Sequence, residues 1–217
     1  MEYLKFNSVV NGTPDVETFS LIQKDSFLDI LIEDSVSGFS FPENSSEAFK
    51  EELNQVVKEV KGTMLDSDEV KAYKSYNVSV PMHIKSYINS VKGPKTAIDL
   101  VEELNFDLLP FIMKLKYRFN RPRPFQLAPY YKVFLTPLVM TKPLPSYPSM
   151  SAIQGIVMCS VLGNRYPPIY RVMNDLSDSI CESRVRLGVN FQSDITGAKI
   201  ISNLILSNTE FKVKYAL

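Results

Sequence analysis

The chain has only one histidine, His83, among its 217 residues. This scarcity excludes metal sites built from several histidines, and it excludes Ser-His-Asp catalysis around any other histidine. The two cysteines, Cys159 and Cys181, occupy apolar positions of helical patterns and do not form a Cys-x-x-Cys pair. A structural zinc site and a disulfide framework are therefore excluded, and both thiols are predicted to be reduced and buried. No metal or cofactor is expected.

Long apolar runs are also missing, because no stretch of about 18 consecutive apolar residues occurs. A membrane span is therefore not expected. The first residues, MEYLKFNSVV, include an acid at position 2 and lack the apolar segment of a signal peptide. Together these absences predict a soluble cytoplasmic protein, with association with a virion as the alternative.

Neither sign of charge dominates, since 24 basic and 24 acidic residues give a formal net charge of zero. This balance makes a nucleic-acid partner unlikely. Apolar residues form 45% of the chain, which is enough for a hydrophobic core in a domain of ordinary size.

Acidic residues are absent from 108 to 174, although that stretch contains nine basic residues. Residues 1–107, by contrast, contain 10 basic and 19 acidic residues. This asymmetry predicts either that an anion binds near the basic stretch or that the acidic N-terminal part folds against it. The sequence leaves both interpretations open.

Apolar residues recur at helical spacing along most of the chain, and no alternating strand series or repeat is present. The pattern of residues 1–43 is mixed, and the short apolar group 27–32 suits a strand or a helix. We predict an all-α protein with an N-terminal extension, residues 1–95, and a helical core, residues 96–217. The expected helices are 45–61 with Asn44 and Glu47 as its cap, 81–92, about 96–119, 149–163, and two that begin near 167 and 193.

Three separated segments combine cations, hydroxyls and helix-opening turns. Phosphate recognition needs this chemistry, namely fixed guanidinium groups, an ammonium, a hydroxyl and free backbone N–H groups. The segments are Lys114 to Phe125, Pro145 to Ala152 and Ser183 to Asp194.

In these segments the chain resembles the superfamily of type-2 phosphatidic acid phosphatases, bacterial non-specific acid phosphatases and vanadium haloperoxidases. Its signature has three blocks, K-x-x-x-x-x-x-R-P, P-S-G-H and S-R-x-x-x-x-x-H-x-x-x-D. Lys116 to Arg123 matches the first block, and we prefer this register because many members read R-x-R-P-F at this point. Lys114 to Arg121 is the alternative register. If the helix continues, Lys116 and Arg123 share one of its faces.

The second and third blocks match in order and spacing, so the resemblance covers about residues 95–210. It implies a helical bundle with a phosphate cage. The phosphate-binding residues that it implies are Lys116, Arg123, Ser149, Met150 and Arg184. Asp194 corresponds to the residue that orients the catalytic histidine in the family, and here it could accept a hydrogen bond from Asn190.

Both signature histidines are replaced. The family's nucleophile, or vanadate ligand, is Asn190 here, and its general acid is Ser151. An amide nitrogen is not nucleophilic, and a serine hydroxyl without a neighbouring base transfers protons poorly near pH 7. The resemblance therefore implies a phosphatase-like pseudoenzyme that binds phosphate or a phosphoester.

Two other functions remain open at this stage. The chain could be a structural or assembly protein, in a homo-oligomer or a viral particle, that reuses the fold and works through its N-terminal residues. It could also be an active phosphomonoesterase that uses Ser151, His83 or water in an altered mechanism. For His83 alone, a partly buried or surface position without catalytic function is the simpler interpretation.

Overall fold

The computed structural model describes residues 8–38, 41–63 and 67–217, and these residues form helices and no strands. The prediction of an all-α fold is confirmed. Residues 1–7, on which much of the expectation about a signal peptide rests, lie outside the described residues.

The N-terminal part contains more helices than its mixed pattern indicated. Residues 27–32, for which the sequence left strand and helix open, are helical. The elements are α2 (Val16–Ile22), the 3-10 helix η1 (Phe27–Leu31), α3 (Ile32–Ser37), α4 (Glu47–Gly62), α5 (Asp68–Val78) and α6 (Val80–Ser90).

The remaining elements follow the predicted helices closely, with short additions. They are α7 (Lys95–Phe119), α8 (Pro124–Leu127), η2 (Ala128–Tyr131), α9 (Met150–Arg165), η3 (Pro167–Ile169), α10 (Tyr170–Arg186), α11 (Gln192–Ser207) and α12 (Thr209–Tyr215).

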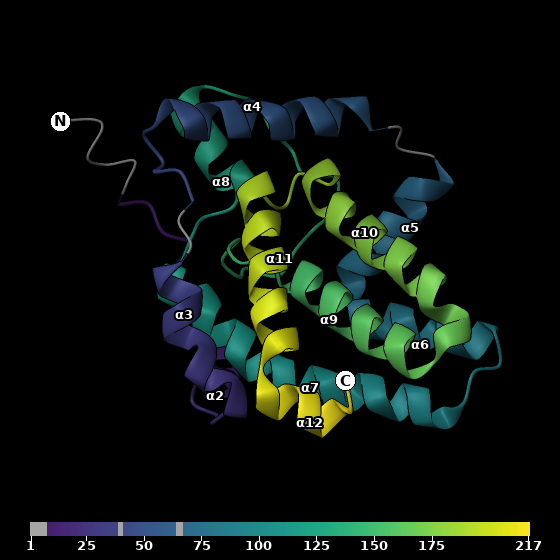
Figure 1. The fold of residues 1–217 in the computed structure, drawn as a ribbon. Helices are drawn as coiled ribbons and strands as arrows, with labels where there is room; N and C mark the ends of the chain where they lie inside the picture. The colour runs from purple at the N-terminus through teal and green to yellow at the C-terminus, as the bar shows by residue number, and fades with distance from the viewer. Residues whose placement is uncertain (1–7, 39–40, 64–66) are drawn as a thin grey trace.

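Helix α9 is the centre of the arrangement, because it packs on α7, α10 and α11. In Figure 1, α4 lies across one end of the molecule and α7 across the other, with α10 and α11 between them. Helices α2 and α6 pack on α7, and α4 and α5 pack on α10. Elements on both sides of residue 95 thus share one hydrophobic core, which includes Phe49, Ile84, Leu108, Val157 and Ile201.

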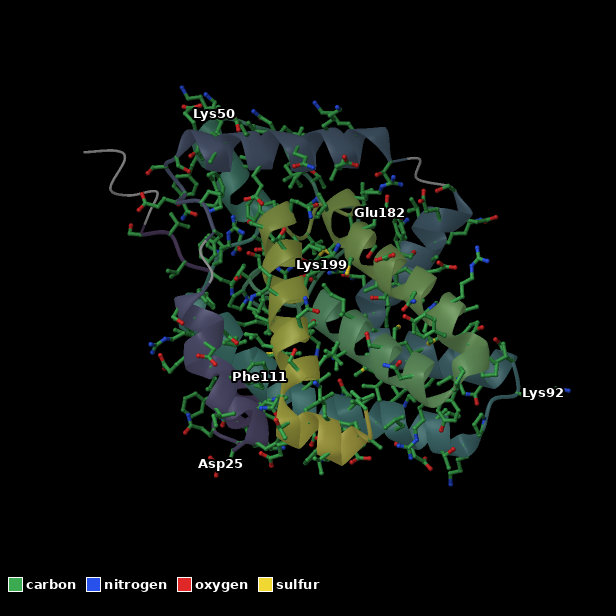
Figure 2. The ribbon with its side chains drawn as sticks, viewed as in Figure 1. Asp25, Lys50, Lys92, Phe111, Glu182 and Lys199 are labelled. Carbon is green, nitrogen blue, oxygen red and sulfur yellow. The ribbon has the colours of Figure 1, made fainter. Side chains whose placement is uncertain are left out.

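The side chains follow the same division between interior and surface. Phe111 belongs to the buried core. The charged residues Asp25, Lys50 and Lys92 lie at the periphery in Figure 2.

Helix α4 begins two residues later than the sequence predicts. The side chain of Ser46, rather than that of Asn44, caps it, because the Ser46 hydroxyl accepts a hydrogen bond from the Phe49 N–H at 3.1 Å. Either residue type suits an N-cap, so sequence alone could not choose between neighbours.

Lys116 and Arg123 do not share a helical face, because the helix does not continue to residue 123. Helix α7 ends at Phe119, and Asn120 adopts the left-handed conformation with φ of 47°. Prolines at 122 and 124 then prevent the helix from continuing. Arg123 is therefore held in an extended segment that leads into α8, and it reaches the same cavity as Lys116 by a different route.

Candidate functional site

A cavity of about 330 Å³ lies where α7, α9, α10 and the segment before α9 meet. It brings together residues from all three sequence blocks. The predicted site residues that line it are Lys116, Arg123, Ser149, Met150, Ser151, Arg184 and Asn190. Asp194 does not line the cavity and instead lies directly behind Asn190.

Lys116 is held by backbone carbonyl groups. Its ammonium donates to the carbonyl oxygens of Pro145 and Pro148, the second at 3.0 Å. The side chain is buried, and burial, followed by repulsion from Arg123, lowers the pKa of Lys116 well below its ordinary value. An anion in the cavity would oppose both effects.

Arg123 is fixed by two carbonyl groups from distant segments. Its Nε donates to the Leu144 oxygen at 3.0 Å, and its Nη1 donates to the Val189 oxygen at 2.7 Å. Burial lowers its pKa to about 10, which reflects a cation that water solvates poorly. The guanidinium is therefore oriented before any ligand arrives.

Arg184 has hydrogen-bonding capacity that the described residues leave unused. Its Nε donates to Asn190 Oδ1 at 3.4 Å and its Nη2 donates to Asn77 Oδ1 at 3.1 Å. The third nitrogen, Nη1, is buried and has no hydrogen-bond partner among the described residues. Burial, then repulsion from Arg123, lowers the pKa of Arg184 to about 9. A buried guanidinium nitrogen without an acceptor is costly.

The start of α9 adds backbone donors to the cavity. Ser149 caps the helix, since its hydroxyl oxygen accepts a hydrogen bond from the Ala152 N–H at 3.4 Å. Met150 and Ser151 are the first two helical residues, and N–H groups at such positions have no acceptor within the helix. Together with the helix dipole they favour an anion at this end of the cavity.

The cations of the two possible registers of the first block have different partners in the structure. Lys114 pairs with Asp29, and Arg121 pairs with Asp194 at 2.6 Å and with Glu52 at 3.0 Å. Within the described part of the chain, no ion pair forms at Lys116, Arg123 or Arg184, and no carboxylate lines the cavity. Asp29, Glu52 and Asp194 thus neutralise Lys114 and Arg121, whereas Lys116 and Arg123 have no carboxylate partner among the residues that the structure describes.

Asn190 stands where the resemblance places the nucleophilic histidine. Both polar atoms of its side chain form hydrogen bonds. Its amide nitrogen donates to the Ser146 oxygen at 2.8 Å and to Asp194 Oδ2 at 3.0 Å. The predicted hydrogen bond between Asn190 and Asp194 is therefore present. Asp194 Oδ2 also accepts from the Phe191 N–H at 2.8 Å. The amide is held rigidly, with Oδ1 toward Arg184.

Behind Asp194 lies a buried charge network that the sequence did not reveal. Arg121 bridges Asp194 and Glu52, and its guanidinium carbon lies 4.3 Å from the ring centre of Phe41 and 4.2 Å from that of Phe191. Glu52 belongs to α4, outside the three blocks. Nothing in the local pattern distinguishes this glutamate from the exposed acids around it.

His83 does not line the cavity. Its Nδ1 lies 3.0 Å from the Ser75 hydroxyl, its ring meets that of Tyr76 edge-on, and burial lowers its pKa. Of the described residues, no group of three or more histidine, cysteine or acidic side chains is placed to hold a metal ion.

Comparisons with known proteins identify the fold and no more. No protein-family profile matches the chain, and no curated protein matches it by sequence. Its structure is similar to the crystal structure of a transmembrane PAP2-type phosphatidylglycerolphosphate phosphatase from Bacillus subtilis. The two share 16% sequence identity with a TM-score of 0.54, over 92% of this chain and 98% of the other. The chain therefore has a PAP2-type helical fold. None of its described helices is both long and apolar enough to span a bilayer.

Proposed function

We propose that this protein binds phosphate, or the phosphate group of a phosphoester, without hydrolysing it. The observation that carries the proposal is the unpaired charge of the cavity. Lys116, Arg123 and Arg184 are buried and line a space that no described carboxylate lines, and Arg184 Nη1 has no hydrogen-bond partner among the described residues. Buried charges are normally paired, and a bound dianion would supply the missing partner.

The cavity residues lack the groups that hydrolysis needs, which supports the proposal that the protein binds phosphate without hydrolysing it. Hydrolysis through a covalent intermediate needs a nucleophile facing the phosphorus atom and an acid for the leaving group. Asn190 offers an amide whose hydrogen bonds hold it in place, and Ser151 has no histidine beside it in the cavity. The neighbouring fold is that of a phosphatase, so the proposed binding site would be a phosphatase site that has lost its reactive groups.

Arg184→Ala should weaken inorganic phosphate binding roughly 10-fold to 150-fold, because a charged hydrogen bond contributes about 1.5–3 kcal/mol. Isothermal titration calorimetry measures the change directly. Arg186→Ala is the matched control, since Arg186 is partly exposed and pairs with Glu69 and Glu182 at the surface. Equal phosphate affinity in both variants and the wild type would contradict the proposal.

Sulfate binding should weaken as the pH rises. Sulfate remains a dianion between pH 6 and pH 8, so any change in its binding over this range comes from the protein. Lys116 has a lowered pKa and is charged only below it, so its attraction for an anion is present at low pH and lost as the pH rises through that pKa. We expect sulfate to raise the melting temperature more at pH 6 than at pH 8, at constant ionic strength. Arg184 and Arg123 stay mostly charged in this range, because their pKa values are about 9 and about 10.

The variant Lys116→Met tests whether Lys116 causes this pH dependence. It should bind sulfate more weakly than the wild type at pH 6 and lose most of the difference between the two pH values. An increase in sulfate stabilisation from pH 6 to pH 8 would show that the lysine does not act as a cation in the site.

A further inference from the structure

The far wall of the cavity carries a pair of side-chain amides that the phosphate cage does not use. Gln154 Nε2 donates to Asn105 Oδ1 at 2.8 Å, which joins α9 to α7. Both residues line the cavity, and Gln154 is only 5% exposed. A buried amide that meets an apolar ligand loses hydrogen bonds to water without replacement.

Gln154 and Asn105 lie farther along α9 and α7, the two helices that also carry Ser151 and Lys116. Gln154 follows Ser151 by three residues on α9, a rise of about 4.5 Å on the same face. On α7, Asn105, Leu109 and Lys116 are four and seven residues apart, and all three line the cavity. The cavity therefore extends from the cationic end, along the interface of α7 and α9, to the two amides.

The hydrogen bond between the amides uses one N–H of Gln154 and the oxygen of Asn105, and it leaves the Gln154 oxygen and the Asn105 amide nitrogen free. Among the described residues, Gln154 Oε1 and Asn105 Nδ2 have no further partner. A hydroxyl group both donates and accepts, so it can satisfy such a pair. Hydroxyl groups of Ser79, Thr141 and Ser151 also line the cavity and add further partners of the same kind.

We propose that the natural ligand is a small phosphomonoester whose organic part carries several hydroxyl groups, and that Gln154 and Asn105 select it. This inference rests on the proposed phosphate binding and adds the class of ligand. The cationic end holds the phosphate group, and the amide pair binds hydroxyl groups several carbon atoms away. An alkyl chain of the same length would leave the Gln154 oxygen and the Asn105 amide nitrogen without a partner.

Sorbitol 6-phosphate and n-hexyl phosphate test the proposal, because they share a six-carbon chain and differ in hydroxyl groups. Calorimetric titration of the full-length protein should show sorbitol 6-phosphate binding at least about tenfold more tightly, the effect of roughly one unpaired buried polar group. In Gln154→Met, which keeps the side-chain length, this ratio should fall to about one. Asn105→Ala, a less buried position, provides a second variant with the same expectation.

Inorganic phosphate and an exposed glutamine serve as controls. Phosphate binding by Gln154→Met shows that the cationic end is intact, and Gln55→Leu on α4 should retain the wild-type ratio. If the wild type binds phosphate but does not favour the polyol ester, or if Gln154→Met and Asn105→Ala keep the preference, the inference is overturned and the proposed function survives. If the wild type binds neither ester nor inorganic phosphate, the proposed function itself is overturned.

Discussion

Replacing Arg121 by methionine should lower the free energy of unfolding by about 3–5 kcal/mol, the usual cost of breaking a buried ion pair from one side. The guanidinium is the shared partner of Asp194 and Glu52, and it lies between two aromatic rings. Methionine fills most of the space but leaves two carboxylates close together without a cation. Urea denaturation followed by circular dichroism measures the loss.

Lys114→Met is the matched control, because it removes the other cation of the same register. The Lys114 ion pair with Asp29 is partly exposed, so its loss should cost at most about 1 kcal/mol. Glu52→Gln should restore part of the stability lost in Arg121→Met, since it removes one of the unpaired charges. Equal stability losses at positions 114 and 121 would show that the buried network contributes nothing beyond an ordinary surface pair.

The fold could be predicted from sequence where a helix buries one apolar face. Helices α4 and α9 have such faces, and both were expected within a few residues of their observed bounds. Helix α5 was not expected, although Val70, Tyr73 and Tyr76 are buried on it. Tyrosine has an apolar ring and a polar end, so a helix that buries tyrosines gives a weak periodic signal.

The candidate site could be predicted only in part, and the reason is physical. The three blocks single out Lys116, Arg123 and Arg184, and in the structure all three line one cavity. Other residues lie outside the three blocks. Asn77 and Gln154 line the cavity, and Glu52 pairs with Arg121 behind it, but the local sequence pattern singles out none of the three. The sequence also could not choose between the two registers of the first block, because that choice depends on which cations the acidic side chains contact in the folded protein.

The double variant Ser151→His/Asn190→His should hydrolyse p-nitrophenyl phosphate, whereas the wild type should not. A histidine at 190 can place Nδ1–H where the amide nitrogen now donates to Asp194 Oδ2, which directs the other ring nitrogen into the cavity. That nitrogen would attack phosphorus, and the bond to the aryl oxygen would break. Water would then cleave the phosphohistidine. Each of the two roles typically contributes on the order of 10²–10⁴-fold in rate.

The single variants separate the two roles. Nitrophenolate leaves without much help from an acid, so Asn190→His alone should retain most of the double variant's activity on this substrate and little on an alkyl phosphate. Ser151→His alone should remain inactive on both, because it supplies an acid and no nucleophile. Adding Arg184→Ala to the double variant should reduce its rate about 100-fold, since the same guanidinium would stabilise the transferring phosphoryl group.

Activity in the wild type would reverse the interpretation, provided that Arg184→Ala abolishes it and so places it in this cavity. The protein would then be an enzyme with a mechanism that uses no histidine at position 190, and Ser151 would be the first residue to replace. Inactivity of the double variant despite retained phosphate binding would instead show that the cavity holds phosphate in a position that a nucleophile at 190 cannot reach. The cage would then be a binding site shaped for its present ligand and no longer a phosphatase site that lacks only its histidines.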